Sequence, residues 1–177
     1  MYKRQIYQQL KETSDSLDSL HIGLVDERFV PVTDEKSNER LIRNCFGEST
    51  QITGMVVDSE DEVNNLLEVR KRYEPFIEHT DVVILGMGTD GHTASIFPYD
   101  PASDDIRRHK REGVFSTKAP NNPTNRITCG IGTLLKAKKI YLVIFGNEKL
   151  NILGGLRENL PIHDFLKSRE DINIVYA

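Results

Sequence analysis

The 177-residue sequence is long enough for one globular domain that buries its own core without disulfides or structural metals. Hydrophobic residues make up 38% and charged residues 28%, with no low-complexity run, which excludes a disordered chain. The net charge of -4 and the pI near 5.8 exclude a general field for nucleic acid or anionic membranes, although they leave room for a local basic pocket that takes one phosphate. We therefore expect a small-molecule partner, and neither nucleic acid nor membrane.

The cysteines and the apolar segments indicate the compartment. Cys45 and Cys129 lack the spacing of metal ligands, and we interpret them as small buried hydrophobic residues in a reducing environment. No stretch approaches the roughly 20 apolar residues of a membrane span. The opening residues MYKRQIYQQL lack the apolar core of a signal peptide, so the sequence predicts a cytosolic protein.

The first half of the chain alternates between helical and strand patterns. In chain order it carries a helix, a strand, a helix, a weaker strand and a helix, at Tyr2–Glu12, His21–Val25, Ser37–Phe46, Ile52–Val57 and Glu60–Glu78. Ser37 and Asn38 predict a helix cap, and Ser59 with Glu62 predicts a capping box before the third helix.

The second half is rich in strands. They are predicted at Val82–Leu85, Gly113–Thr117, Ile140–Phe145 and Ile172–Tyr176. The charged segment Tyr99–Arg111 is predicted to be a solvated, mobile loop. Strands that alternate with helices predict βαβ units, so the fold class is α/β, a Rossmann-like three-layer α/β/α arrangement with a mostly parallel sheet, in a single domain over residues 1–177.

A glycine-rich turn follows the strand in "VVILGMGTDGHTASIFP" (82–98). Gly86, Gly88 and Gly91 predict positive φ angles and a close approach, with a short helix beginning at His92. Their spacing matches the dinucleotide-binding fingerprint, but two prolines limit the following helix to about two turns, where that motif needs a full helix. No lysine followed by Ser or Thr lies in the turn, which excludes a nucleoside triphosphatase phosphate loop.

Asp90 and His92 carry the chemistry of this turn. Imidazole is the usual general base near neutral pH. A structural alternative is that His92 caps a helix and Asp90 is a turn residue. We favour the functional interpretation, because a histidine between a glycine turn and a helix start is costly to keep for packing alone.

A second polar segment, Asp26–Pro31, also follows a strand and is expected at the same edge of the sheet. Arg28 presents a planar fork of donors to a phosphate or carboxylate, or else forms a surface salt bridge with Glu27 or Asp34; spacing alone leaves both open. Arg126 is expected to be a cation at a strand end.

In three blocks the sequence closely resembles the 6-phosphogluconolactonases, within the family that includes the glucosamine-6-phosphate isomerases. The blocks are "DERFVPVTDEKSN" (26–38), "GMGTDGHTASIFP" (86–98) and "NRIT" (125–128), in the family's order. The resemblance implies hydrolysis of 6-phospho-D-glucono-1,5-lactone to 6-phosphogluconate in the oxidative pentose phosphate pathway, with a phosphosugar lactone as partner and no metal or organic cofactor.

The resemblance also implies roles for individual residues. His92 is the expected base that activates water, supported by Asp90 or by a more distant carboxylate such as Asp26. The expected substrate-binding residues are Asp26, Arg28, Gly88, Gly91, Arg126 and, as a weaker candidate, Lys149.

Two segments separate the activities of this family. The isomerases carry a catalytic glutamate in an Asn-Glu-Pro ending where this chain has Ile96-Phe97-Pro98, and a tyrosine where it has Arg28. Both differences favour the lactonase. The alternatives are an impaired fragment or a phosphosugar-binding module without turnover, and, less favoured, an isomerase.

Family members usually begin with a further strand and a Ser-Gly-Gly-Ser-Thr-Pro-like turn that holds the substrate phosphate. Met1 and Tyr2 fall about where that turn would end. The resemblance thus implies an N-terminally truncated domain, and we expect lower activity from this chain than from a version extended upstream.

Overall fold

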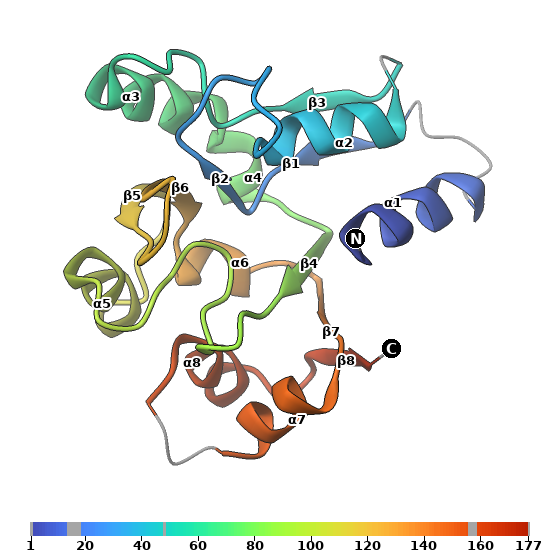
Figure 1. Ribbon diagram of the computed structural model, residues 1–177, viewed down its shortest axis with the longest axis vertical. Coiled ribbons are helices and arrows are strands. Elements are labelled where there is room, and N and C mark those ends of the chain that lie inside the picture. The colour runs from blue at the N-terminus through green and yellow to red at the C-terminus, as the bar shows by residue number, and fades with distance from the viewer. Residues whose placement is uncertain (1, 14–18, 48, 156–158, 177) are drawn as a thin grey trace.

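The computed structural model describes residues 2–13, 19–47, 49–155 and 159–176 (Figure 1). Met1, where the resemblance places the end of a phosphate-binding turn, lies outside the described residues. The elements in chain order are α1 (Tyr2–Thr13), β1 (His21–Gly23), β2 (Asp26–Arg28), α2 (Asn38–Phe46), β3 (Gln51–Thr53), α3 (Glu62–Arg72), α4 (Glu74–Glu78), β4 (Val82–Gly86), α5 (Pro101–Arg108), β5 (Val114–Lys118), β6 (Asn125–Cys129), α6 (Ile131–Leu135), β7 (Lys139–Ile144), α7 (Asn147–Gly154), α8 (Pro161–Ser168) and β8 (Asn173–Tyr176).

The described strands form three sheets. Two are parallel, β1 with β3 and β4-β7-β8, and helices flank them in the α/β arrangement that the sequence predicts (Figure 1). The third sheet, β2-β6-β5, is antiparallel. Its β2 lies in the polar segment that was expected to follow a strand: the strand expected at His21–Val25 ends at Gly23, and a new strand begins at Asp26.

Short polar side chains cap the starts of α2 and α3. Ser37 caps α2 as predicted, because its side chain accepts a hydrogen bond from the Arg40 N–H. The capping box at Ser59 is wrong: Asp61 caps α3 instead. The helical pattern predicted over Glu60–Glu78 divides into α3 and α4, since Pro75 has no N–H and is accommodated in the first turn of a new helix.

Two predictions after β4 are wrong. No helix begins at His92; residues 87–98 form turns held by bridges of Thr93 to Met87 and Ile96. The segment predicted as a mobile loop contains α5, capped by Asp100 with Pro101 in its first turn. Proline breaks a helix interior but favours a first turn, so Pro101 starts a helix instead of ending one.

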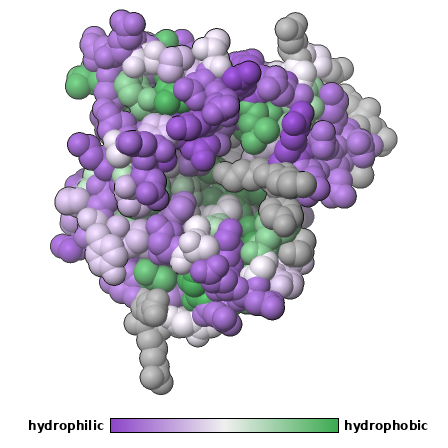
Figure 2. All heavy atoms as spheres, in the orientation of Figure 1, coloured by the Kyte–Doolittle hydropathy of each residue, from purple (hydrophilic) through white to green (hydrophobic). Residues whose placement is uncertain are grey.

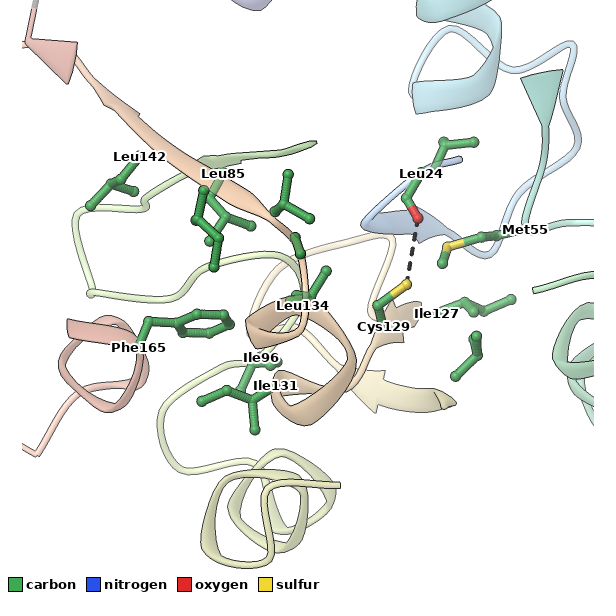
Figure 3. Packing of buried hydrophobic residues seen from close by; sticks show 14 of the residues in the cluster. Leu24, Met55, Leu85, Ile96, Ile127, Cys129, Ile131, Leu134, Leu142 and Phe165 are labelled. Atoms are coloured by element: carbon green, nitrogen blue, oxygen red, sulfur yellow. Dashed lines mark hydrogen bonds between the residues drawn. The ribbon is translucent and has the colours of Figure 1, made fainter. Parts of the chain in front are cut away.

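A hydrophobic cluster joins the sheets of the described chain. Figure 3 shows Leu85 and Leu142, from the neighbouring strands β4 and β7, on the same side of the cluster as Phe165 of α8. Ile96 lies near Ile131 in the same view and is fully buried. The segment after His92 is thus held down by a core side chain.

The molecular surface is mostly polar. In Figure 2 hydrophilic residues cover most of the visible face, and hydrophobic residues gather around a hollow near its middle. Within the described ranges, no helix has the length and apolar character needed to cross a membrane.

Candidate active site

Asp90 and His92 form a hydrogen-bonded pair in the turn after β4. His92 Nδ1 lies 2.5 Å from Asp90 Oδ1, and the His92 backbone N–H donates to the same oxygen over 3.2 Å. Because an ionised carboxylate only accepts, the ring proton of a neutral His92 belongs on Nδ1. The sequence left direct contact between these side chains open, and the structure shows it.

The glycines of the turn have different tasks. A Cβ at Gly88 would lie 2.3 Å from both His92 Cε1 and Nδ1 and 2.6 Å from Asp90 Oδ1. Gly91 has a φ of +75°, which favours glycine. The prediction of positive φ is therefore confirmed for Gly91 and wrong for Gly86 and Gly88. The groups that approach Gly88 closely are the side chains of Asp90 and His92.

The pair remains accessible to small molecules. The side chains of His92 and Asp90 are 32% and 38% exposed. Partial burial alone would raise the pKa of Asp90, but the hydrogen bonds from His92, and the charge that its ring carries when protonated, hold that pKa below its ordinary value. The His92 ring also packs on Phe97, with centroids 4.6 Å apart. These contacts fix the ring and leave Nε2 without a hydrogen-bond partner among the described residues.

Ser95 fastens this loop to the antiparallel sheet. Its Oγ donates to Asp26 Oδ2 over 2.7 Å, and its N–H donates to Thr128 Oγ1 over 3.2 Å. Thr117 Oγ1 donates to the Ser95 carbonyl over 2.6 Å. The loop that carries His92 and the segment that begins at Asp26 therefore meet, as predicted, although the strands before them, β4 and β1, belong to different sheets instead of sharing one edge.

Arg28 and Arg126 lie directly opposite each other on β2 and β6. Residues in this register point to the same face of an antiparallel pair, and like charges there are destabilising unless something neutralises them. Asp26 lies on the same face, two residues before Arg28.

Neither arginine forms a salt bridge within the part of the chain that the structure describes. Arg28 Nη1 donates to the Lys36 carbonyl over 3.0 Å and to Asn38 Oδ1 over 2.7 Å, so the predicted alternative of a salt bridge with Glu27 or Asp34 is wrong. Arg126 Nη1 donates to the carbonyls of Pro123 and Asn125. All of these acceptors are uncharged, so the positive charges of the two adjacent arginines are not neutralised.

Arg126 is the more buried of the two. Only 8% of the residue is exposed to solvent. Burial, followed by the nearby charge of Arg28, lowers the pKa of Arg126, while Asp26 and Glu27 act in the opposite direction. Two cations in this position favour a bound anion.

Glu27 is a residue whose part in the site the sequence did not reveal. It is 1% exposed, and its carboxylate accepts from the Asn38 and Glu39 N–H groups at the start of α2, at 2.7 and 2.8 Å. Ser37 Oγ and the Arg28 N–H also donate to it. Burial raises the pKa of Glu27, and these hydrogen bonds only partly offset the rise. Glu27 thus joins β2 to α2.

Two further side chains belong to the helices α7 and α1. Lys149 lies in α7, after β7, the neighbour of β4, and the structure shows no hydrogen bond from it to the other candidates among the residues it describes. Tyr7 of α1 was not foreseen: burial, and then the charge of Asp26, raise the pKa of Tyr7 to about 12. Among the described residues, no group of three or more His, Cys, Asp or Glu is placed to hold a metal ion.

The family model for glucosamine-6-phosphate isomerases/6-phosphogluconolactonase matches residues 2–172. The chain belongs to this family. A 6-phosphogluconolactonase from Caulobacter vibrioides is 30% identical over 184 residues, which cover 97% of this chain and 78% of that protein. A 6-phosphogluconolactonase from Helicobacter pylori is 33% identical over 146 residues, covering 79% of this chain, and the match spans 62% of its own length.

Solved structures agree with the family assignment. A 6-phosphogluconolactonase from Shewanella baltica superposes with a TM-score of 0.88 at 26% identity, over 99% of this chain and 79% of that one. One from Neisseria gonorrhoeae, described as putative, gives 0.81, also at 26% identity, over 97% and 79%. The family fold thus holds although the described strands pair as three sheets.

Proposed function

We propose that this chain hydrolyses 6-phospho-D-glucono-1,5-lactone to 6-phospho-D-gluconate, the reaction of the oxidative pentose phosphate pathway for which its relatives are named. The observation that carries the proposal is the Asp90–His92 pair, whose Nε2 is available, joined through Ser95 and Asp26 to two arginines without carboxylate partners. A general base can hydrolyse an ester, and a nearby pair of arginines can bind a phosphate, so together they match a phosphorylated ester as substrate.

The reaction needs one proton carrier. His92 Nε2 removes a proton from water, whose oxygen attacks the lactone carbonyl carbon. Asp90, hydrogen-bonded to Nδ1, orients the ring and stabilises the imidazolium that forms. When the tetrahedral intermediate collapses, the bond between the carbonyl carbon and the ring oxygen breaks, and His92 returns its proton to that oxygen. The carboxylic acid product then ionises.

The arginines supply the affinity. In this proposal Arg28 and Arg126 bind the substrate phosphate, and Asp26 orients the loop through Ser95. Gly88 and Gly91 shape the turn against the substrate, and Lys149, from the adjacent strand end, is a further cation for the same anion.

The isomerase alternative is less favoured because two side chains lack the necessary chemistry. Ile96 and Phe97 occupy the segment where the resemblance places the catalytic glutamate of isomerases, and they are 0% and 5% exposed. Buried hydrocarbon side chains carry no proton. Two free, buried cysteines agree with a reducing compartment, so we place the activity in the cytosol.

The test is lactone hydrolysis, corrected for spontaneous ring opening, by the parent chain and by His92→Ala. We expect the variant to lose at least about 100-fold in kcat, the usual contribution of a positioned base. His79→Ala is the matched control, because His79 also pairs with an aspartate, Asp81, but is exposed and precedes β4, whereas Asp90 and His92 follow that strand. A parent that binds 6-phosphogluconate without turnover would instead support a phosphosugar-binding module.

A further inference from the structure

The guanidinium of Arg28 is held from one end. Its described hydrogen bonds both start from Nη1, toward the Lys36 carbonyl and Asn38 Oδ1. Nη1 carries two N–H donors, so these bonds use it completely. The Nε–H and the Nη2 amino group remain, and they form the edge of a guanidinium that binds phosphate or carboxylate in a bidentate way.

Asn38 is itself fixed on three sides. Its backbone N–H donates to Glu27 over 2.7 Å, and its Nδ2 donates to the Asp26 carbonyl over 3.0 Å. Its Oδ1 accepts from Arg28 over 2.7 Å, and the residue is 8% exposed. An amide whose donor and acceptor are both in use cannot rotate without losing one of them.

We infer that Asn38 is a positioning residue for the anion site: it aims the free edge of Arg28 at the bound phosphate and leaves the charge of Arg28 intact. An amide oxygen accepts the Nη1–H while carrying no charge. A carboxylate at the same place would orient Arg28 equally well but neutralise it. The inference rests on the proposed function in taking the ligand to be a phosphosugar.

Glu27 holds Arg28 and Asn38 in place through hydrogen bonds to their backbones. Its carboxylate binds the N–H groups of Asn38 and Arg28 at once, so the two residues share one buried anchor. The anchor is on the opposite face of β2 from Arg28, as alternation along a strand requires. Its charge therefore holds the backbone without pairing with the guanidinium.

The experiment compares Asn38→Asp and Asn38→Ala with the parent by calorimetric titration of inorganic phosphate and of 6-phosphogluconate. We expect Asn38→Asp to weaken both ligands by about tenfold or more, the scale of a charge-assisted hydrogen bond. Asn38→Ala, which frees the guanidinium but leaves its charge, should lose less. Asn44→Asp is the control, since it adds the same charge to the same helix.

Lactone kinetics provide the second measurement. A residue that acts through phosphate binding raises KM while kcat stays near the parent value, because the phosphate contacts are equal in ground and transition states. A melting temperature for each variant identifies a misfolded protein, and Asn38→Ala serves if the aspartate variant does not fold. The parallel His92→Ala protein should bind phosphate like the parent.

Parent-like phosphate binding by both Asn38 variants would overturn the inference, as would an equal loss in Asn44→Asp or a fall in kcat alone. A parent that binds neither ligand overturns it too, because Arg28 then holds no anion. If the parent binds phosphate with the expected dependence on Asn38 but opens no lactone, the inference stands and the proposed function fails.

Discussion

Gly88 determines how closely Asp90 and His92 pack on the turn. The space that a Cβ at Gly88 would fill is occupied by His92 Cε1 and Nδ1, at 2.3 Å, and by Asp90 Oδ1, at 2.6 Å. Real Cβ contacts never come so close, so any larger residue displaces the pair. The backbone of Gly88 is conventional, with no positive φ, and its requirement for glycine is therefore steric.

We predict that Gly88→Ala lowers kcat by about 100-fold, the scale expected when the proposed catalytic base is misplaced by about 1 Å. Stability should change little, because the side chains that move are partly exposed. Lactone hydrolysis and thermal melting measure the two effects. Gly86→Ala is the matched control, since a Cβ at Gly86 meets nothing within 4 Å. Equal activity of the two variants would contradict the steric argument.

The positions of the polar side chains that follow strands and turns could be predicted from the sequence, but their partners only in part. Asp90 and His92 stand out because they follow a strand and a glycine turn, and Arg28 and Arg126 because they follow or open strands. Glu27 was considered only as a salt-bridge partner. Its hydrogen-bond donors come mostly from the start of a helix about ten residues later, and sequence spacing does not reveal such long-range bonds.

Among the elements, α5 is the helix that the sequence prediction missed, because its proline was taken to end a helix when it lies in a first turn. The segment was expected to be a loop because it is charged and contains prolines, yet its buried residues Ser103 and Ile106 are spaced for one helix face. The helix ends in a Schellman motif: Arg111 N–H donates to the Ile106 carbonyl and Lys110 N–H to the Arg107 carbonyl.

Lys110 occupies the left-handed position of this motif, with a φ of +45°. A residue with a Cβ is strained there, and glycine is not. We predict that Lys110→Gly raises the free energy of unfolding by about 0.5–1 kcal/mol. Urea denaturation measures the change. Lys110→Ala removes the same exposed side chain but keeps the Cβ, so it should give no gain; an equal gain in both would assign the effect to the lysine charge.

At the scale of the whole molecule, the α/β class followed from alternating patterns, whereas the pairing of the strands did not. The antiparallel sheet places Asp26–Arg28 against Arg126–Thr128, segments about a hundred positions apart, and only tertiary structure supplies that register. The facing arginines are a consequence of this pairing. Local periodicity predicts an element, but the site depends on which distant element lies beside it.

The two cysteines lie in different parts of the fold, Cys45 in a helix and Cys129 in a strand. Cys129 lies in β6, the central strand of the antiparallel sheet, and its Sγ donates to the Leu24 carbonyl over 3.6 Å (Figure 3). Burial raises the pKa of Cys129 to about 12. Cys45 lies in α2, against which α1 packs, and burial also raises its pKa, while the charges of Arg4 and Lys11 in α1 lower it.

We predict that a thiol reagent at pH 8 labels Cys45 before Cys129. The thiolate is the form that reacts, and the raised pKa of each cysteine disfavours its thiolate in the folded protein. Separation of α1 from α2 exposes Cys45 by a local opening, whereas Cys129 is exposed only when the central strand loses its neighbours on both sides, which requires global unfolding. Labelling rates of Cys45→Ala and Cys129→Ala proteins at increasing urea measure this: the rate at Cys129 should follow the unfolding equilibrium, and the rate at Cys45 should depend less on urea. If both rates rise with urea in parallel, α1 and the antiparallel sheet unfold as one cooperative unit.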